Sequence, residues 1–440
     1  MYSGGEEVSA VVLDIGCQSI RCGYAGEENP KFVQPVSVGV PEANDAEKVY
    51  PVNFFAKRDH MAVRPACTYA YSGEARAPPP AADANGDQQP AEDVRICRGR
   101  SQINVDEDML ATILYHLESP RGLSINWKET PVLVTEPTRH SKPYREKITQ
   151  ILFETFQVNA CYVAKSAVLA TYASGRTTAL TLDIGANHST AVAVTDGFAN
   201  QKTVQEYPVG GNLLEDELAK ILTQKRKSVH PQFAYKKTVT DGSEKYDKQD
   251  ISKVHESYRD LAIREQLRRV KEQQCRVADD DKLVDSVTGL PGAPFVLPDG
   301  TEIETDPFQY RLPERLLRPE LFSEQEEIYG FPGLPRMLVD VLHCAPLETR
   351  KELLNAIVVT GGGSCFQGLP ERMEKMMLHN DYMGPNLRFK VIASPQPNER
   401  KFSTWIGGSI LASLGSFQQL WISKHEWDEG RGATVERKCA

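Results

Sequence analysis

The sequence has few of the features that mark membrane-bound, secreted or metal-stapled proteins. Its 440 residues include nine cysteines, but no two of them form a CxxC pair and none is spaced with histidine as in a zinc site. No apolar run is long enough to span a bilayer, and no apolar signal region stands at the N-terminus. We therefore expect a reduced, soluble, intracellular protein.

An excess of basic residues is also missing. The formal net charge is −9, and 25% of the residues are charged, which is ordinary for globular proteins. Short basic runs at 225–227 and 268–269 are explained by solvated surfaces. This balance argues against sequence-specific nucleic-acid binding and against a membrane partner. The length predicts two or more domains with a large core.

Two β-hairpin patterns with the same turn residues are the first chemical signal. An apolar run at 179–182 ends in Asp-Ile-Gly at 183–185, and a second β-type run begins at Thr190. Residues 10–13 lead in the same way into Asp-Ile-Gly at 14–16. Such a turn points backbone N–H groups into one concavity that suits a phosphate. The aspartate at the strand end is then placed to hold Mg²⁺ through water.

The repetition favours a ligand site over two unrelated turns. It predicts a duplicated α/β unit with a nucleotide bound in the crevice between the copies. A third motif follows a buried strand at 357–360 and consists of Gly361, Gly362 and Gly363. Alone, such a motif is usually a flexible turn. After two phosphate hairpins, we interpret it as the edge that lies against a flat base.

Three other segments are predicted from composition and periodicity. Residues 72–93 are rich in Pro, Ala, Asp and Gln, and we expect a disordered surface loop there. Acidic residues followed by apolar positions at helical spacing predict a helix over 106–117. The highly charged stretch 241–281 has helical spacing and predicts a long, exposed helix.

The three glycine-containing motifs, in this order, resemble those of the actin superfamily. The most specific match is the C-terminal WIGGSILASL at 405–414, and YASGRTT at 172–178 is also similar to actin. The pattern Asp-x-Gly-Ala-x-His at 183–188 is most similar to that of the nuclear class known as actin-related protein 4. The resemblance is good over residues 8–40, 100–220 and 355–440, and weak over 41–99 and 221–350.

This resemblance implies an α/β fold of the actin-like ATPase type. Two duplicated α/β domains, divided into four subdomains, would surround a nucleotide cleft. The large domain would comprise 1–165 and 402–440, with subdomain 2 at about 36–99. The small domain would comprise 166–401, with subdomain 4 at about 211–326.

The resemblance also implies a site for ATP and Mg²⁺, with Asp14 and Asp183 holding the water shell of the metal. Where actin has a small Ser-Gly pair, this chain has Cys17 and Gln18, and the bulkier Gln18 works against tight packing of the γ-phosphate. The residues expected at the nucleotide are Asp14, Gly16, Cys17, Gln18, Arg21, Asp183, Gly185, Ala186, Asn187, His188, Gly361, Gly362, Gly363, Phe366 and Lys401.

The groups that position the hydrolytic water in actin are replaced here. Ser166 stands for a glutamine, Thr190 for a histidine and Ala186 for an acidic residue. His188 lies two residues before Thr190 and could face the same side of a strand, although a hydrogen-bonded turn histidine is the alternative. We therefore expect no catalytic residue and little or no ATP hydrolysis, which needs a positioned water.

The class that the chain resembles implies a subunit of nuclear chromatin-remodelling and histone acetyltransferase complexes, in the nucleus or also in the cytoplasm. Its expected partners are a scaffold helix of the remodelling ATPase or acetyltransferase platform, actin or another actin-related protein, and histones. The helix would bind in a cleft whose exposed rim includes Tyr172 and Ser174, while Ile410 and Leu414 are expected to be core.

Two other functions remain open. A cytoskeletal, filament-forming ATPase is disfavoured by Ser166, Ala186 and the altered region 41–99. A sugar kinase or chaperone relative, which would share the two hairpins, is disfavoured by the actin-like C-terminus.

Overall fold

The computed structural model describes most of the chain, namely residues 9–44, 47–72, 100–139, 141–240, 242–281, 284, 294–304, 308–322, 328, 330–378 and 388–439. The predicted loop 72–93 lies outside these residues except for Ser72, which ends strand β6 (Cys67–Ser72). Among the described residues, no helix combines the length and apolar character needed to cross a membrane.

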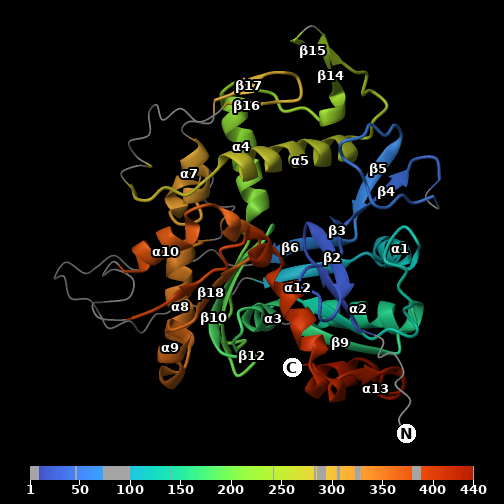
Figure 1. The fold of residues 1–440 in the computed structure, drawn as a ribbon, viewed down its shortest axis with the longest axis vertical. Coiled ribbons are helices and arrows are strands. Elements are labelled where there is room, and N and C mark those ends of the chain that lie inside the picture. The colour runs from blue at the N-terminus through green and yellow to red at the C-terminus, as the bar shows by residue number, and fades with distance from the viewer. Residues whose placement is uncertain are drawn as a thin grey trace, which may run out of the picture.

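Two six-stranded sheets form the centre of the molecule (Figure 1). The first has the order β20 (Ile422–Ser423), β9 (Ala160–Lys165), β8 (Val132–Glu136), β1 (Val11–Ile15), β2 (Ser19–Tyr24) and β3 (Phe32–Pro35). The second has the order β12 (Phe198–Ala199), β11 (Ser189–Thr195), β10 (Ala179–Ile184), β18 (Ile357–Thr360) and β19 (Val391–Ile392), and β13 (Gln205–Tyr207) also pairs with β11.

The two sheets share one topology. In the first sheet, β1 is antiparallel to β2 and parallel to β8, and β9 continues the parallel pairing. In the second, β10 is antiparallel to β11 and parallel to β18, and β19 continues in the same way. The predicted duplication of an α/β unit of the actin type is therefore confirmed. The residue boundaries of the two domains stay a prediction.

The turns of the two hairpins are also alike, because each is closed by the same backbone hydrogen bond. The N–H of Gly16 donates to the carbonyl oxygen of Ser19 at 3.0 Å, and that of Gly185 donates to the carbonyl oxygen of His188 at 3.0 Å. The repeated sequence therefore forms repeated geometry at the ends of the two central strands.

Helices pack on each sheet along their apolar faces. On the first sheet lie α1 (Glu107–Glu118) and α2 (Lys142–Gln150), and a π-helical turn at Ile151–Thr155 continues α2. Helix α1 begins where predicted, because the side chain of Asp106 accepts the N–H of Met109 at 3.1 Å. The apolar face predicted for this helix, including Ile113 and Leu117, is fully buried.

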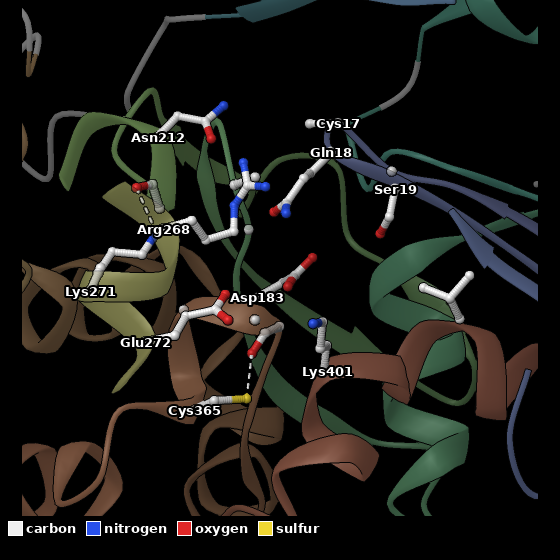
Figure 2. Close-up of a pocket in the computed structure, with 18 of the residues that line it drawn as sticks. Cys17, Gln18, Ser19, Asp183, Asn212, Arg268, Lys271, Glu272, Cys365 and Lys401 are labelled. Atoms are coloured by element: carbon white, nitrogen blue, oxygen red, sulfur yellow. Dashed lines mark hydrogen bonds between the residues drawn. The ribbon is translucent and has the colours of Figure 1, made fainter. Parts of the chain in front are cut away.

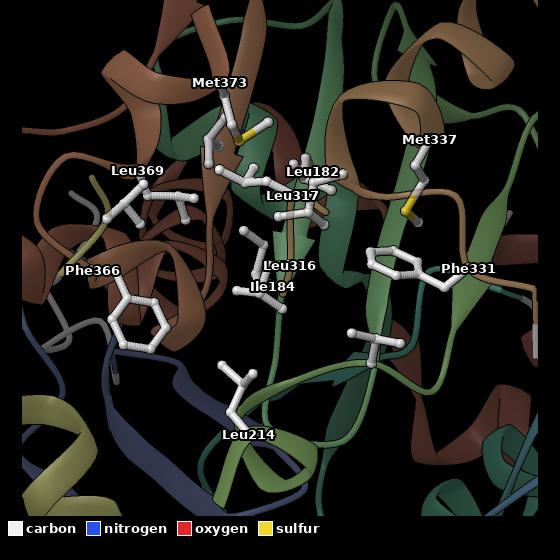
Figure 3. Close-up of a cluster of buried hydrophobic side chains, with 14 of the residues drawn as sticks. Leu182, Ile184, Leu214, Leu316, Leu317, Phe331, Met337, Phe366, Leu369 and Met373 are labelled. Carbon is white, nitrogen blue, oxygen red and sulfur yellow. The ribbon is translucent and has the colours of Figure 1, made fainter. Parts of the chain in front are cut away.

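The second sheet carries the larger core (Figure 3). Among the described residues, Leu182 and Ile184 from β10 lie with side chains from six helices or their flanking turns, and Met373 is fully buried there. These helices are α4 (Gly211–Gln224), α5 (Glu256–Gln274), α7 (Phe308–Glu314), α8 (Leu334–Cys344), α9 (Leu347–Leu354) and α10 (Leu369–Met377).

Helices α3 (Ser166–Ala173) and α12 (Pro397–Ser413) cross between the two sheets (Figure 1). A Cβ at Gly407 would collide with the carbonyl oxygen of Leu169, so the crossing requires glycine there. The indole of Trp405 donates to the carbonyl oxygen of Val12 at 3.0 Å. Helix α13 (Lys424–Lys438) ends the chain beside the first sheet.

One expectation about α12 is wrong. Ile410 and Leu414 are not core residues, because they are 39% and 44% exposed. Gly408, whose Cβ position lies against Val12 of β1 and Leu169, stands two residues before Ile410 and so on the other side of α12. Ile410 and Leu414 therefore remain as apolar side chains at the surface.

Four small two-stranded sheets complete the strands that the structure describes. They pair β4 (Ser37–Pro41) with β5 (Met61–Pro65), β6 with β7 (Arg100–Val105), β14 (Tyr235–Thr240) with β15 (Ser243–Lys248), and β16 (Phe295–Val296) with β17 (Glu302–Ile303).

Helix α5 (Glu256–Gln274) runs between the central sheets and the strands β14–β17 towards β5 (Figure 1). An apolar cluster joins the two, with Phe54 and Met61 on one side and Tyr258 and Ala262 on the other. The hydroxyl of Tyr258 also donates to the carbonyl oxygen of Asn53 at 2.6 Å. The stretch 241–281 is thus not an exposed helix, because α5 starts only at residue 256 and buries one face.

Candidate functional site

A cavity of about 940 Å³ lies between the two hairpins, helix α5 and the loop after β18. This volume is typical of ligand sites. Every residue predicted to lie at the nucleotide lines this cavity except Asn187. The side-chain oxygen of Asn187 instead accepts a hydrogen bond from Asn212, which itself lines the cavity. Figure 2 shows Gln18, Arg268, Asp183 and Lys401 pointing into this space.

Asp14 is held at the end of β1 by two partners. Its Oδ2 lies 2.5 Å from Nη1 of Arg21, and its Oδ1 accepts a hydrogen bond from the hydroxyl of Thr135 at 2.8 Å. Asp14 is only 5% exposed, so its charge needs such partners. The carboxylate is therefore fixed in direction before any ligand binds.

Asp183 occupies the equivalent place at the end of β10. Burial raises the pKa of its carboxyl, and the charge of Asp14 acts in the same direction, while His188 and Arg21 lower the pKa. An ionised carboxylate in this position is costly without a nearby cation. The pair of aspartates is therefore suited to a bound cation.

The three glycines after β18 differ in what they contact. A Cβ at Gly361, whose φ is +88°, would collide with Oδ1 of Asp183, and one at Gly363 would collide with the side chain of Ile184. Only Gly362 has open space at its Cβ position. Two of the glycines thus allow the loop to pack on the second hairpin, and Gly362 is the one left to lie against a ligand.

Cys17 and His188 meet across the two hairpin turns. The sulfur of Cys17 lies 4.0 Å from Nδ1 of His188, and Nε2 of His188 lies 4.0 Å from Oε1 of Glu206. Burial lowers the pKa of His188, but the interactions with Cys17, Glu206 and Asp183 outweigh it and raise the pKa to about 9. At neutral pH this imidazole is a cation that faces the cavity wall.

Helix α5 supplies residues that the sequence did not place at the site, and Arg268, interpreted there as part of a solvated basic run, lines the cavity instead. The amide of Gln18 meets the guanidinium of Arg268, and Lys271 donates to Oε1 of Glu215 at 2.8 Å. Glu272 also lines the cavity. Residues 268, 271 and 272 follow the three-and-four spacing of one helix face. This spacing is the sequence signal that indicates that they share a face.

Ser166 lines the cavity at the start of α3. Its hydroxyl lies 2.9 Å from that of Thr138, and the hydroxyl oxygen of Thr138 also accepts the N–H of Ala167 at 3.2 Å. Thr190 is buried on β11 and pairs with Glu206 of β13. The hydroxyl of Ser166 is thus engaged with a neighbouring side chain.

The far end of the cavity has an apolar side and a cation. Phe366 is 7% exposed and belongs to the core of the second sheet (Figure 3), and Lys401 lies at the start of α12. Cys365 also lines this end, where its thiol donates to the carbonyl oxygen of Pro397 at 3.4 Å. An aromatic surface beside a cation suits a planar polar ligand.

The two residues predicted to bind a partner lie away from this cavity, at the end of α3. Tyr172 and Ser174 are half-buried, and the hydroxyl of Ser174 donates to the carbonyl oxygen of Thr171 at 2.7 Å. Neither side chain is part of the cavity wall. Their role in binding stays a prediction.

The side chains and backbone N–H groups around the cavity meet the requirements of Mg²⁺ and a nucleotide. Two hairpin turns and the cations Arg21, Arg268 and Lys401 face the cavity and suit a polyphosphate. Within the described part of the chain, no three His, Cys, Asp or Glu side chains are grouped to hold a metal directly. The residues therefore fit a Mg²⁺ bound through water and phosphate oxygens.

Comparison with known proteins agrees with this geometry. The family model described as actin matches residues 5–440. Proteins named actin-related protein 4 are similar over full length: the one from Oryza sativa subsp. indica is 36% identical over 455 residues and the one from Arabidopsis thaliana 34% over 450, with 100% of each chain covered. The one from Schizosaccharomyces pombe is 28% identical over 467 residues, covering 100% of this chain and 99% of its own. The chain therefore belongs to the actin family, as an actin-related protein most similar to the class named actin-related protein 4.

Proposed function

We propose that the chain is an ATP- and Mg²⁺-binding subunit of nuclear chromatin-remodelling and histone acetyltransferase complexes, with little or no ATPase activity, that docks on a scaffold helix. The observation that carries the nucleotide part is the convergence of two equivalent hairpins on one cavity. Asp14 and Asp183 end the central strands there, and Arg21 and Lys401 face the same space.

Each group of residues has a definite part in this binding. Asp14 and Asp183 would hold the hydrated metal, which neutralises phosphate charge when bound. The turns at Gly16 and Gly185 would present N–H groups to the phosphates. Gly362 and Phe366 would border the adenosine. Because Arg21 already neutralises Asp14, we expect metal and phosphate to bind together.

The weak hydrolysis follows from the groups around Ser166. A hydrolytic water must be held in line with the phosphate by an amide or a base. Ser166 has a short hydroxyl that lies against Thr138, and Ala186 offers no polar group. His188 faces Cys17 and Glu206 and, as a cation, does not accept a proton from water.

The assembly part of the proposal rests on the similarity to proteins named actin-related protein 4. A scaffold helix, actin or another actin-related protein, and histones are the proposed partners, and the nucleus is the proposed location. Filament formation is the competing function. Salt-triggered sedimentation separates the two, because a subunit that docks on a scaffold should stay in the supernatant where a filament former pellets.

The nucleotide site is tested by thermal unfolding with and without Mg-ATP. A ligand at about 100 times its Kd stabilises the folded state by about 2.7 kcal/mol, and this gain should vanish on chelation of Mg²⁺. Asp14→Asn and Asp183→Asn should each lose most of it, because both remove charge at nearly constant volume. Asp428→Asn, an exposed partner of Lys424 on α13, is the matched control. A wild-type chain that is not stabilised by Mg-ATP would overturn the proposal.

A further inference from the structure

Four side chains form a polar series that begins on the cavity wall with Cys17 and His188 and continues into the protein. It runs from Cys17 in the first hairpin to His188 in the second, then to Glu206 on β13 and Arg139 after β8. Oε2 of Glu206 accepts a hydrogen bond from Nε of Arg139 at 3.2 Å. A thiol, an imidazole and a carboxylate in this order are the arrangement that activates a sulfur nucleophile.

The imidazole in this series is held in place and charged. The side chains of His188 and Glu206 are only 17% and 2% exposed. The titratable groups that face His188 are Cys17, Glu206 and Asp183, and the ring of Tyr69 lies 6.1 Å from its ring. Although burial lowers the pKa of His188, these neighbours raise it to about 9. A cation beside a sulfur stabilises the thiolate, which is the nucleophilic form.

A second thiol in the same cavity provides the contrast. The thiol of Cys365 donates to two backbone carbonyl oxygens, those of Pro397 at 3.4 Å and Gly361 at 3.8 Å, and burial raises its pKa. Carbonyl acceptors stabilise the protonated thiol and not the thiolate. The two cysteines therefore share one solvent space but have opposite neighbours.

Of the remaining described cysteines, Cys275 also lines the cavity but is buried, and the other five lie outside the cavity wall. Burial raises the pKa of each of these thiols, namely Cys22, Cys67, Cys161, Cys275, Cys344 and Cys439. Among the cysteines that the structure describes, Cys17 thus has both a histidine at 4.0 Å and a place on the cavity wall.

We propose that Cys17 is a modification site, a thiol that His188 and Glu206 prepare for attack on small electrophiles and on hydrogen peroxide that enter the cavity. The thiol first gives its proton to solvent, and the imidazolium of His188 stays beside the sulfur. The sulfur then attacks one peroxide oxygen, so that an S–O bond forms and the O–O bond breaks. The departing hydroxide takes a proton from His188 and leaves as water, and the imidazole regains a proton from solvent. Sulfur is oxidised by two electrons to the sulfenic acid, and peroxide is reduced.

Modification at this position has a consequence for the ligand, which rests on the proposed nucleotide function. Cys17 lies in the turn whose N–H groups are assigned to the phosphates. A carbamidomethyl group or an added oxygen on its sulfur takes up space in that concavity. Bound nucleotide and a modified Cys17 should therefore exclude one another, so that the redox state of one thiol controls whether the cavity fills.

The reactivity is tested on the full-length native chain with iodoacetamide. The initial rates of alkylation at Cys17 and Cys365 are measured by mass spectrometry of their peptides across a range of pH. Cys17 should react at least about tenfold faster at neutral pH, because an imidazolium lies beside its sulfur and only carbonyl oxygens lie beside that of Cys365. Equal rates at the two positions in the wild-type chain would overturn the proposal, and this comparison needs no variant.

Two variants test whether His188 and Glu206 cause the fast alkylation of Cys17. His188→Gln should slow alkylation of Cys17 by about tenfold, because the cation beside the sulfur is lost. Glu206→Gln should act in the same direction. Cys365→Ser is the control that should leave the rate at Cys17 unchanged. An unaltered rate at Cys17 in a folded His188→Gln chain would contradict the assigned role of the imidazole.

A parallel set of reactions contains Mg-ATP, with Cys344 outside the cavity as the reference thiol. Protection of Cys17 but not of Cys344 supports the exclusion and the nucleotide site together. Fast alkylation of Cys17 without protection would keep the modification site and contradict the proposed nucleotide function. Slow alkylation of Cys17 in a chain that Mg-ATP stabilises would contradict the modification site and keep the proposed nucleotide function.

Discussion

The amide of Gln18 and the guanidinium of Arg268 connect the two halves of the molecule across the cavity. With its oxygen towards helix α5, the amide accepts hydrogen bonds from Nε of Arg268 at 2.8 Å and from Nη1 at 2.7 Å. Glu215 and Glu265 hold Arg268 at 3.2 Å and 2.5 Å. The apolar cluster around Tyr258 joins the same helix to β5, so two separate contacts resist opening.

Replacing Gln18 by alanine should speed nucleotide release. Hydrogen bonds to charged groups are worth about 1.5–3 kcal/mol, so a contact broken on opening slows opening by about tenfold or more. Gln18→Ala should therefore release a fluorescent ATP analogue about tenfold faster in stopped-flow chase experiments. Gln34→Ala removes another glutamine of the cavity wall, on β3, and serves as the control. Equal release from wild type and Gln18→Ala would show that this contact does not limit opening.

The raised pKa of His188 predicts a loss of stability at alkaline pH. A group whose pKa rises on folding, here from 6.5 to about 9, contributes stability that is complete below its unfolded pKa and disappears as pH rises through the folded one. The free energy of unfolding should therefore fall between pH 6.5 and 9, by on the order of 3 kcal/mol at most. Urea unfolding at several pH values measures this decrease.

The matched variant for this prediction is His188→Gln, which keeps a hydrogen-bonding side chain but cannot carry charge. Its unfolding free energy should be lower than that of wild type at pH 6.5 and close to it above pH 9. If the two proteins lose stability in parallel over this range, other groups cause the decrease.

The hairpins could be predicted from the sequence because their signals are local. Alternation at period 2 and the Asp-Ile-Gly turns at 14–16 and 183–185 need no information from distant residues. The contributions of Arg268 and Lys271 could not be predicted in this way. They lie on a helix with many charged residues, and tertiary packing alone decides which of its faces meets the cavity.

The apolar residues of α12 show the opposite case, in which a local sequence signal predicts the wrong environment. Their sequence suggests a core helix, yet Ile410 is 39% exposed. Gly408 allows α12 to approach β1 and α3 on the side opposite Ile410, which leaves Ile410 away from the core. The position of a close helix crossing depends on both partners, so one segment read alone assigns the wrong face.

Ser166→Gln should raise ATP turnover. The present hydroxyl lies 2.9 Å from Thr138 and is too short to hold a water beside a phosphate, and losing one positioning group typically costs about two to three orders of magnitude in rate. We expect phosphate release from Ser166→Gln to exceed the wild-type rate by about tenfold or more. Because Thr190 and Ala186 are unchanged, full activity is not expected. Ser166→Ala, which offers no polar group, is the control and should match wild type.

The surface at the end of α3 lies apart from the nucleotide cavity. Tyr172 and Ser174 are half-buried there, and α12, which packs against α3, leaves Ile410 and Leu414 exposed. A helix that binds in a groove needs apolar side chains open to solvent, and a few of them carry most of its affinity. The exposure of Ile410 and Leu414 therefore adds two candidates to the predicted rim.

A charge placed on this rim should weaken docking without affecting nucleotide. Ser174→Glu puts a carboxylate where an apolar helix would pack, and an unpaired charge at a desolvated contact costs at least about 1–3 kcal/mol. Capture of scaffold subunits from nuclear extract should fall by about tenfold, while stabilisation by Mg-ATP stays at the wild-type level. Ser119→Glu is the matched control, because Ser119 also ends a helix and donates to a carbonyl oxygen three residues back at 2.7 Å. Loss of Mg-ATP binding with intact capture would place the docking surface elsewhere.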